Sequence, residues 1–161
     1  MNNLPAEQLY NVSAQIFEDL GFLLPTPELE DSQLAAPIDA TVDVAFYGPF
    51  AGTLRVALCG GLLPMLAANM LGTDEDLPLA QQLDSLGEIG NVICGNLLPS
   101  LVGSKQVFLV GAPQVTTGEP PESGAESVTL ATTQIGLEEG RADVRLQVSP
   151  EGIAYIKDGP Q

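Results

Sequence analysis

Residues 77–102 carry the pattern that most restricts how this chain folds. At about 100° per residue, the apolar side chains of this stretch gather on one side of a helix, which is ample for a buried stripe. We expect Asp76 before the first turn and Pro78 inside it to start the helix, and Gly103 to end it. The predicted stripe consists of Leu79, Leu83, Leu86, Ile93, Leu97 and Leu101.

The opposite side of this helix forms a narrow polar ridge, which we call the ridge. It consists of Gln81, Asp84, Glu88, Asn91 and Gly95. The plain interpretation is the solvated face of an amphipathic helix, but such faces usually mix bases with acids, and residues 77–102 contain no Lys or Arg. Gly95 costs about 1 kcal/mol relative to alanine, yet it would let another surface approach the backbone beside Asn91. Gly87 and Gly90, towards the flanks, would let neighbouring elements pack closely.

The rest of the chain predicts an α+β fold with a mostly antiparallel sheet covered by helices, in a single domain over 1–161. Alternation of apolar and polar residues in 41–48 and 52–60 predicts a hairpin whose one face is buried. Two further helices are predicted, one over 5–20 with Leu9, Val12, Ile16 and Leu20 on one face and a short apolar one over 61–72. Further strands are predicted over 106–115, 127–137, 141–149 and 152–157. The remaining segments are a loop over 25–37, a flexible acidic loop near 118–126 and a short tail over 158–161.

The charge of the chain excludes some partners. The 161 residues include 21 acidic and 5 basic side chains, a net charge of −16. Such a chain is repelled by nucleic acid and by anionic membrane surfaces. The excess can serve solubility alone, or it can suit a partner that presents a lysine or a metal ion.

The chain contains no histidine, which excludes His general bases and His metal ligands. Cys59 and Cys94 each lie in an apolar stretch, so we expect buried hydrophobic residues and not ligands or nucleophiles. The chain shows no disulfide framework, no signal peptide at its N-terminus and no apolar run long enough to span a bilayer. These features favour a cytoplasmic protein.

The spacing Asp84-x-x-x-Glu88-x-x-Asn91 resembles the signature of the CheC/CheX/FliY phosphatases of bacterial chemotaxis. The surroundings resemble the CheX branch, over about residues 5–150. Pro113 lies close to the position of that family's proline. The similar segments are FYGPFAGTLRVAL, LLPMLAANMLG, LGEIGNVICGNLLPSLVG and VFLVGAPQVTTG.

The resemblance implies an enzyme that removes phosphate from the phospho-aspartate of a CheY-type receiver domain. Asn91 would hold the attacking water, and Glu88 would pair with the receiver's own lysine, which supplies the base that the ridge lacks. Because an acyl phosphate has a good leaving group, positioning and charge stabilisation can suffice without a strong base. Mg²⁺ would belong to the receiver, so the chain is expected to need no cofactor or metal of its own.

The other polar residues near the motif have weaker expectations. Gln81, Asp84 and Gly95 are expected to contact the partner, although Asp84 can equally serve only to keep the helix solvated. Asn96 lies about 120° from the ridge and is expected to bond within the fold. The acids of residues 74–76 favour the helix dipole and need no metal.

Three alternatives remain open on the sequence alone. The first is a CheX-like module that binds a receiver or another signalling protein without hydrolysing anything. The second is an assembly module, since members of the resembled family can form homodimers by joining their sheets. The third, an acidic metal-binding protein, has little beyond the net charge to support it.

Overall fold

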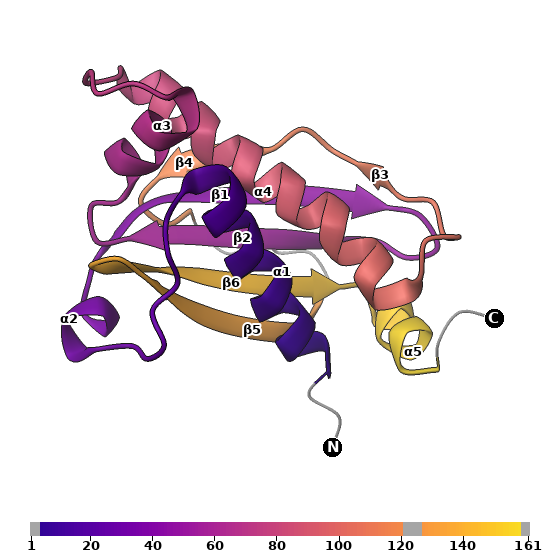
Figure 1. Ribbon diagram of the computed structural model, residues 1–161. Coiled ribbons are helices and arrows are strands. Elements are labelled where there is room, and N and C mark those ends of the chain that lie inside the picture. The colour runs from indigo at the N-terminus through magenta and orange to yellow at the C-terminus, as the bar shows by residue number, and fades with distance from the viewer. Residues whose placement is uncertain (1–3, 121–126, 159–161) are drawn as a thin grey trace.

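The computed structural model describes residues 4–120 and 127–158 and contains one antiparallel sheet with helices on one face (Figure 1). The strands run in the order β3-β1-β2-β6-β5, and β4 also pairs with β1. Their bounds are β1 Ile38–Tyr47, β2 Gly52–Cys59, β3 Leu109–Val110, β4 Gln114–Thr117, β5 Val128–Leu137 and β6 Gly140–Val148. The expected α+β class and antiparallel sheet are confirmed.

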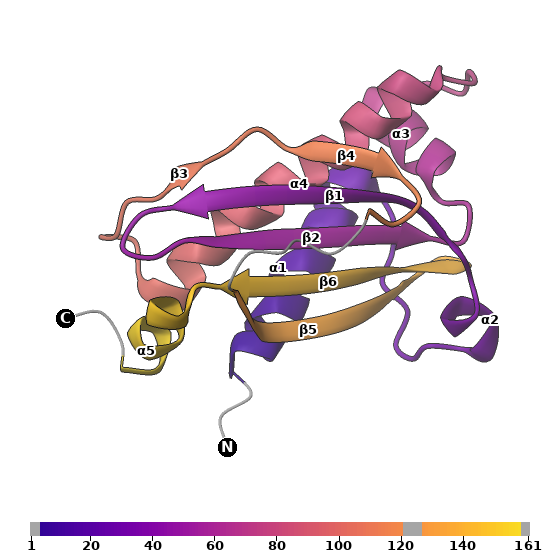
Figure 2. The ribbon, with the colours of Figure 1, turned by 180° about the vertical axis from the view of Figure 1, so that it is seen from behind.

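The helices divide into a layer over the sheet and two short pieces at its ends. Helices α1 and α4 cross one face, which we call the front face, and α3 packs beside α4 (Figure 1). Figure 2 shows the other face, the back face, which neither of them covers. The bounds are α1 Leu4–Gly21, α2 Asp31–Leu34, α3 Leu63–Leu71, α4 Leu79–Val102 and α5 Pro150–Asp158.

The core lies between the front face of the sheet and this helical layer. The predicted hairpin is confirmed: β1 pairs with β2, and the alternate side chains Val42, Val44 and Phe46 are fully buried. In α1 the buried face is rotated from the predicted one. Leu9 is buried as expected, but Phe17 takes the central place, while Ile16 is only half-buried.

The predicted last strand over 152–157 is wrong, because this segment lies in α5. Pro150 suits the first turn of a helix, and an acid follows it at Glu151. Ile153 and Ile156 are three residues apart, a spacing that places them on one face of a helix but on opposite faces of a strand. Tyr155 then contacts Phe50 with ring centroids 5.4 Å apart, which fastens α5 to the end of the hairpin.

The strand predicted over 106–115 is interrupted. Residues 111–113 separate β3 from β4, and both pieces pair with β1. Pro113 has no N–H to donate to a ladder, so it suits such a break at the edge of a sheet. The loop predicted over 25–37 also contains the single turn of α2, where the Gln33 side-chain oxygen accepts a hydrogen bond from the Glu30 amide at 2.7 Å.

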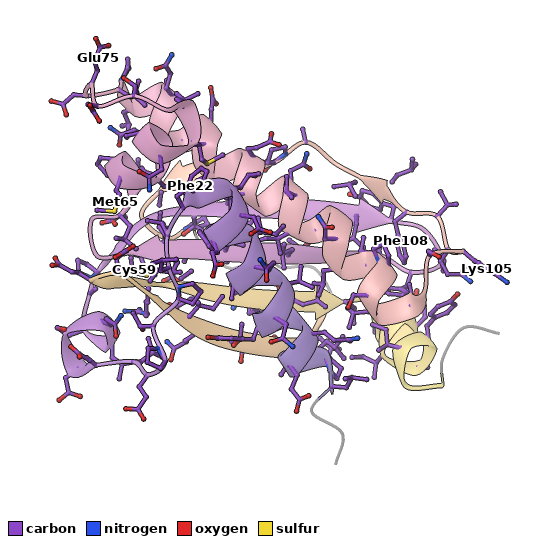
Figure 3. The ribbon with its side chains drawn as sticks, in the orientation of Figure 1. Phe22, Cys59, Met65, Glu75, Lys105 and Phe108 are labelled. Carbon is purple, nitrogen blue, oxygen red and sulfur yellow. The ribbon has the colours of Figure 1, made fainter. Side chains whose placement is uncertain are left out.

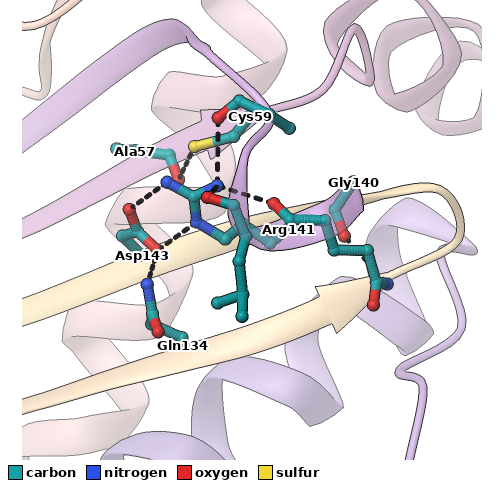
Figure 4. A network of polar contacts seen from close by, with 9 residues as sticks. Ala57, Cys59, Gln134, Gly140, Arg141 and Asp143 are labelled. Atoms are coloured by element: carbon teal, nitrogen blue, oxygen red, sulfur yellow. Dashed lines mark hydrogen bonds and ion pairs between the residues drawn. The ribbon is translucent and has the colours of Figure 1, made fainter. Parts of the chain in front are cut away.

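The back face carries an ordered set of ion pairs. Arg55 donates two hydrogen bonds to Asp43, of 2.7 and 2.9 Å, directly across β1 and β2. Arg141 pairs with Asp143 at 2.8 and 3.1 Å (Figure 4). Arg145 stands opposite Arg55 in the next strand, so all three arginines of the chain lie on this face.

Arg141 also ties α2 to the sheet. One terminal nitrogen of its guanidinium donates to the backbone oxygens of Gln33, Leu34 and Ala36, at 2.7 to 3.0 Å. The hydrogen bond to Asp143 raises the pKa of Arg141, so the guanidinium stays charged. An arginine that is 8% exposed therefore has the partners that a buried charge requires.

The two cysteines are buried hydrophobic residues, as predicted. Burial raises the pKa of the Cys59 thiol and of the Cys94 thiol to about 12 each. Both thiols are therefore protonated at neutral pH and are poor nucleophiles.

Two predicted segments fall wholly or partly outside the described residues. Residues 121–126 of the expected acidic loop and residues 159–161 of the expected tail lie there, while Asp158 closes α5. Within the part of the chain that the structure describes, no helix is both long and apolar enough to cross a membrane.

Candidate functional site

The ridge of α4 faces solvent along its whole length. Its members Gln81, Asp84, Glu88, Asn91 and Gly95 are all exposed, as the helical periodicity predicts. Glu88 and Asn91 are three residues apart, which places their β-carbons about 5–6 Å from each other on one face. A carboxylate and a carboxamide are thus presented together on a rigid helix.

Two glycines hold α4 close to the sheet beneath the ridge, as expected. A β-carbon on Gly90 would lie 2.8 and 3.1 Å from the two methyl groups of Val42 in β1. A β-carbon on Gly87 would lie 3.2 Å from Val115 and 3.5 Å from Pro113. Pro113 therefore packs under the flank of α4, behind the ridge and not in it.

Gly95 differs from these two glycines. A β-carbon there would meet no atom within 4 Å. The fold itself therefore gives no steric reason for a glycine at this position. Its absent side chain leaves the helix backbone open one turn beyond Asn91.

The predicted buried stripe is correct in the middle of the helix and wrong at its start. Leu86, Ile93 and Leu97 are buried, and Leu83 and Leu101 are half-buried. Leu79 is 53% exposed, because the first turn of α4 stands past the edge of the sheet next to α3 in both views (Figures 1 and 2). The predicted stripe omitted four further buried apolar residues of the helix, Ile89, Cys94, Leu98 and Val102, although the burial of Cys94 was expected from its apolar surroundings.

The expected start of α4 also needs correction. The helix begins at Leu79, and Pro78 occupies the N-cap position without a side-chain hydrogen bond. Asp76 lies two residues earlier and does not cap the helix. The acids of residues 74–76 are exposed, and within the described ranges no group of three or more His, Cys, Asp or Glu could hold a metal ion.

The helical layer has a single sign of charge. The sequence contains no Lys or Arg before Arg55 and none between Arg55 and Lys105, so α1, α3 and α4 carry no base. The described arginines lie on the back face, across the sheet. Solvent cations or a partner must therefore balance the negative charges of Asp84 and Glu88.

The second asparagine near the ridge has a structural contact, as predicted. Asn96 donates through Nδ2 to the backbone oxygen of Val92 at 2.8 Å. Ser85 likewise donates through Oγ to the backbone oxygen of Gln81 at 3.1 Å. These two polar side chains serve α4 itself.

A groove runs along one side of the ridge, between α3 and α4, and we call it the α3–α4 groove. Its volume is about 330 Å³, and it is lined by Met70, Leu71, Gln81, Asp84, Ser85 and Glu88. Sequence reasoning missed Met70 and Leu71. Their signal was the composition of residues 62–72, in which Asn69 is the one polar side chain, so a short helix leaves some of its apolar atoms at the surface.

Larger hollows of the molecule lie elsewhere. One of about 580 Å³ lies on the back face and is lined in part by Arg55, Asp143 and Arg145. Another of about 960 Å³ lies beside α2 and is lined in part by Glu28, Asp31 and Glu138. Arg55 is already paired with Asp43. Size alone therefore does not mark the functional site, and the ridge with its groove is the better candidate.

The sheet, its helical layer and the motif on α4 define the class of CheX and CheC-like chemotaxis proteins. The family model described as "Chemotaxis phosphatase CheX" matches residues 40–133, which include most of β1 and all of β2, α3 and α4. The chain belongs to the CheX family. No curated protein sequence matches it.

Solved structures with the same fold agree with this assignment. A CheX chemotaxis protein from Desulfovibrio desulfuricans has 18% identity and a TM-score of 0.73, over 90% of this chain and 99% of that one. CheX from Vibrio vulnificus has 20% identity and a TM-score of 0.69, over 92% and 100%. A CheX–CheY–BeF3–Mg²⁺ complex from Borrelia burgdorferi has 16% identity and a TM-score of 0.61, over 89% and 95%.

Proposed function

We propose that this chain is a phosphatase that hydrolyses the phospho-aspartate of a CheY-type receiver domain. The observation that carries the proposal is the exposed pair Glu88 and Asn91 on α4, in a chain of the CheX family. The Borrelia burgdorferi relative was solved in complex with CheY, which supports a receiver as the partner.

Asn91 is proposed as the catalytic residue. A carboxamide both donates and accepts hydrogen bonds, so it can hold a water molecule in line with the phosphorus of the receiver's acyl phosphate. The aspartyl carboxylate is the leaving group, which needs no protonation by a strong acid. Positioning of this water by Asn91 would then account for most of the rate gain, just as a glutamine positions the attacking water in GTPases.

Glu88 is proposed to pair with the receiver's active-site lysine. The absence of any base in α1, α3 and α4 leaves this carboxylate available for a charge supplied by the partner. A charge-assisted hydrogen bond of this kind fixes the docking register as well as adding affinity. It would hold Asn91 over the phosphoryl group.

The rest of the ridge is proposed to contact the receiver around this centre. Gln81 and Asp84 lie on the N-terminal side of Glu88, and Gly95 allows close approach beyond Asn91. Mg²⁺ is proposed to be held by the receiver and not by this chain. No cofactor of the chain itself enters the proposed reaction.

A dephosphorylation assay tests the proposal. Receiver domains from the same organism are phosphorylated with labelled acetyl phosphate, and loss of label is followed with and without this protein. Asn91→Ala should slow turnover by about 100-fold or more, in line with the loss of one positioned group, while it leaves binding to a beryllofluoride–Mg²⁺-loaded receiver largely intact. Glu88→Ala should slow turnover and weaken that binding as well.

The chain supplies a matched control for each change. Asn96→Ala removes a carboxamide from the same helix, one that donates a hydrogen bond to the helix backbone at Val92. This variant should keep turnover within about twofold. Glu18→Ala removes an exposed acid from α1 and should also be neutral. A wild-type protein that binds the receiver without shortening the lifetime of the phosphate would make it a binding module and would overturn the proposal.

A further inference from the structure

We propose that the α3–α4 groove is a second docking point, which receives an apolar side chain of the receiver next to the lysine that pairs with Glu88. Leu71 is its main contact and acts as a specificity-determining residue. This inference rests on the proposed function, because it extends the same interface. The groove contact would distinguish one receiver from another, whereas Glu88 and Asn91 would contact the lysine and the phosphoryl group that receivers share.

The groove is apolar on one wall and acidic on the other. Met70 and Leu71 come from α3, and Asp84 and Glu88 come from α4. Leu71 is 55% exposed, although it is the last residue of a helix whose other leucines, Leu63 and Leu66, are buried. An apolar wall beside two carboxylates fits a partner segment in which an apolar residue stands next to a cation.

The groove is continuous with the ridge. Three of the five ridge residues, Gln81, Asp84 and Glu88, also line the groove. A receiver lysine that reaches Glu88 would therefore bring its neighbouring residues to the mouth of the groove. The volume of about 330 Å³ is at the small end of the range for ligand pockets, which suits one side chain better than a separate ligand.

The end of α3 explains why Leu71 stands at the rim. Gly72 follows with φ of 65°, a left-handed conformation that stops the helix there. The chain then turns into the exposed acids of residues 74–76 before α4 begins. These acids add further negative charge around an apolar contact, which strengthens the preference for a basic neighbour.

The experiment separates affinity from chemistry. Turnover of a phosphorylated receiver is measured over a range of receiver concentrations for Leu71→Ala, and binding of the beryllofluoride–Mg²⁺-loaded receiver is measured in parallel. We expect KM and Kd to rise about tenfold, which corresponds to about 1.4 kcal/mol of binding free energy. At saturating receiver, kcat should stay within about twofold.

Met65→Ala is the matched control. Met65 is also an apolar residue of α3 and is 46% exposed, but it does not line the groove; its side chain is labelled in Figure 3. This variant should leave KM and Kd within about twofold. Because Leu71 is mostly exposed, its truncation should leave Tm within about 2 °C of the wild-type value. The Tm measurement therefore shows that the variant is folded.

Two outcomes would overturn the groove proposal. One is an unchanged KM and Kd for Leu71→Ala; the other is a change in the self-association of the chain, seen by light scattering, instead of a change in receiver affinity. Neither touches the proposed function, which depends on Asn91→Ala. If Asn91→Ala keeps full turnover, the proposed function fails whatever Leu71→Ala does.

Discussion

Gly90 of α4 lies directly over Val42 of β1, and a β-carbon on the glycine would come within 2.8 Å of a Val42 methyl group. This contact sets how deeply the helix sits on the sheet. Asn91, the next residue, faces solvent. A close contact between helix and sheet therefore lies immediately behind the proposed catalytic residue.

Gly90→Ala should destabilise the protein by about 1–3 kcal/mol, because the new methyl group needs space that Val42 and Val44 already fill. Urea denaturation followed by circular dichroism measures the change. Pairing the substitution with Val42→Ala should recover part of the loss, since the two changes occupy the same space. A fully additive double variant would contradict the contact.

Gly95→Ala should have the opposite effect on stability. Nothing lies within 4 Å of the new methyl group, so the gain in helix propensity should stabilise the protein by about 0.5–1 kcal/mol. If a receiver packs against this backbone, the same variant should show a higher KM. A more stable protein with unchanged KM would remove Gly95 from the docking surface.

The buried Cys94 thiol should make stability depend on alkaline pH. Its pKa is about 12 in the folded protein and about 8.5 in an unfolded chain. The stabilisation is complete below pH 8.5 and is lost as pH rises towards 12, because the unfolded state releases its proton first. At pH 10.5 the loss should be about 2–3 kcal/mol relative to neutral pH. Comparing Cys94→Ala with the wild type in urea at both pH values isolates this group.

The Asp43–Arg55 pair should matter for stability and not for activity. It lies on the back face, with 28% and 13% of the two side chains exposed, and it is bidentate. Asp43→Ala should cost about 1–2 kcal/mol, more than a fully exposed pair would. A double-mutant cycle with Arg55→Ala measures the coupling, and the dephosphorylation rate should be unchanged in Asp43→Ala at a temperature where it is folded.

Receiver binding should weaken with salt. The ridge presents Asp84 and Glu88 without a base in the helical layer, and exposed charges are screened over about 8–10 Å at physiological ionic strength. KM should therefore rise between 50 and 300 mM NaCl, mainly through the association rate. Glu88→Gln should flatten this dependence; an equal slope in the variant would place the salt-sensitive contact elsewhere.

The sequence predicted the face of α4 because a helix repeats every 3.6 residues whatever it packs against. The exposure of Glu88 and Asn91 and the burial of Leu86 and Ile93 follow from that period. The exposure of Leu79 does not, because it depends on where the sheet ends. Likewise the strand pattern of 41–48 was clear, whereas α5 required knowing that Tyr155 could reach Phe50.

Contacts between distant segments could not be predicted at all. The groove needs the end of α3 beside the start of α4, and the spacing of Leu71 from Glu88 along the chain does not fix that arrangement. The row from Asp43 through Arg55 to Arg145 depends on the register of three strands. Period and composition give the faces of each element, but not which faces meet.

The helical layer carries acids and no base, whereas the back face balances Arg55 and Arg141 with Asp43 and Asp143. A positively charged surface would therefore be attracted more strongly to the helical side than to the back face while the two molecules are still separated by water. The protein would thus be oriented before contact, and a larger share of its encounters with such a surface would begin at α4.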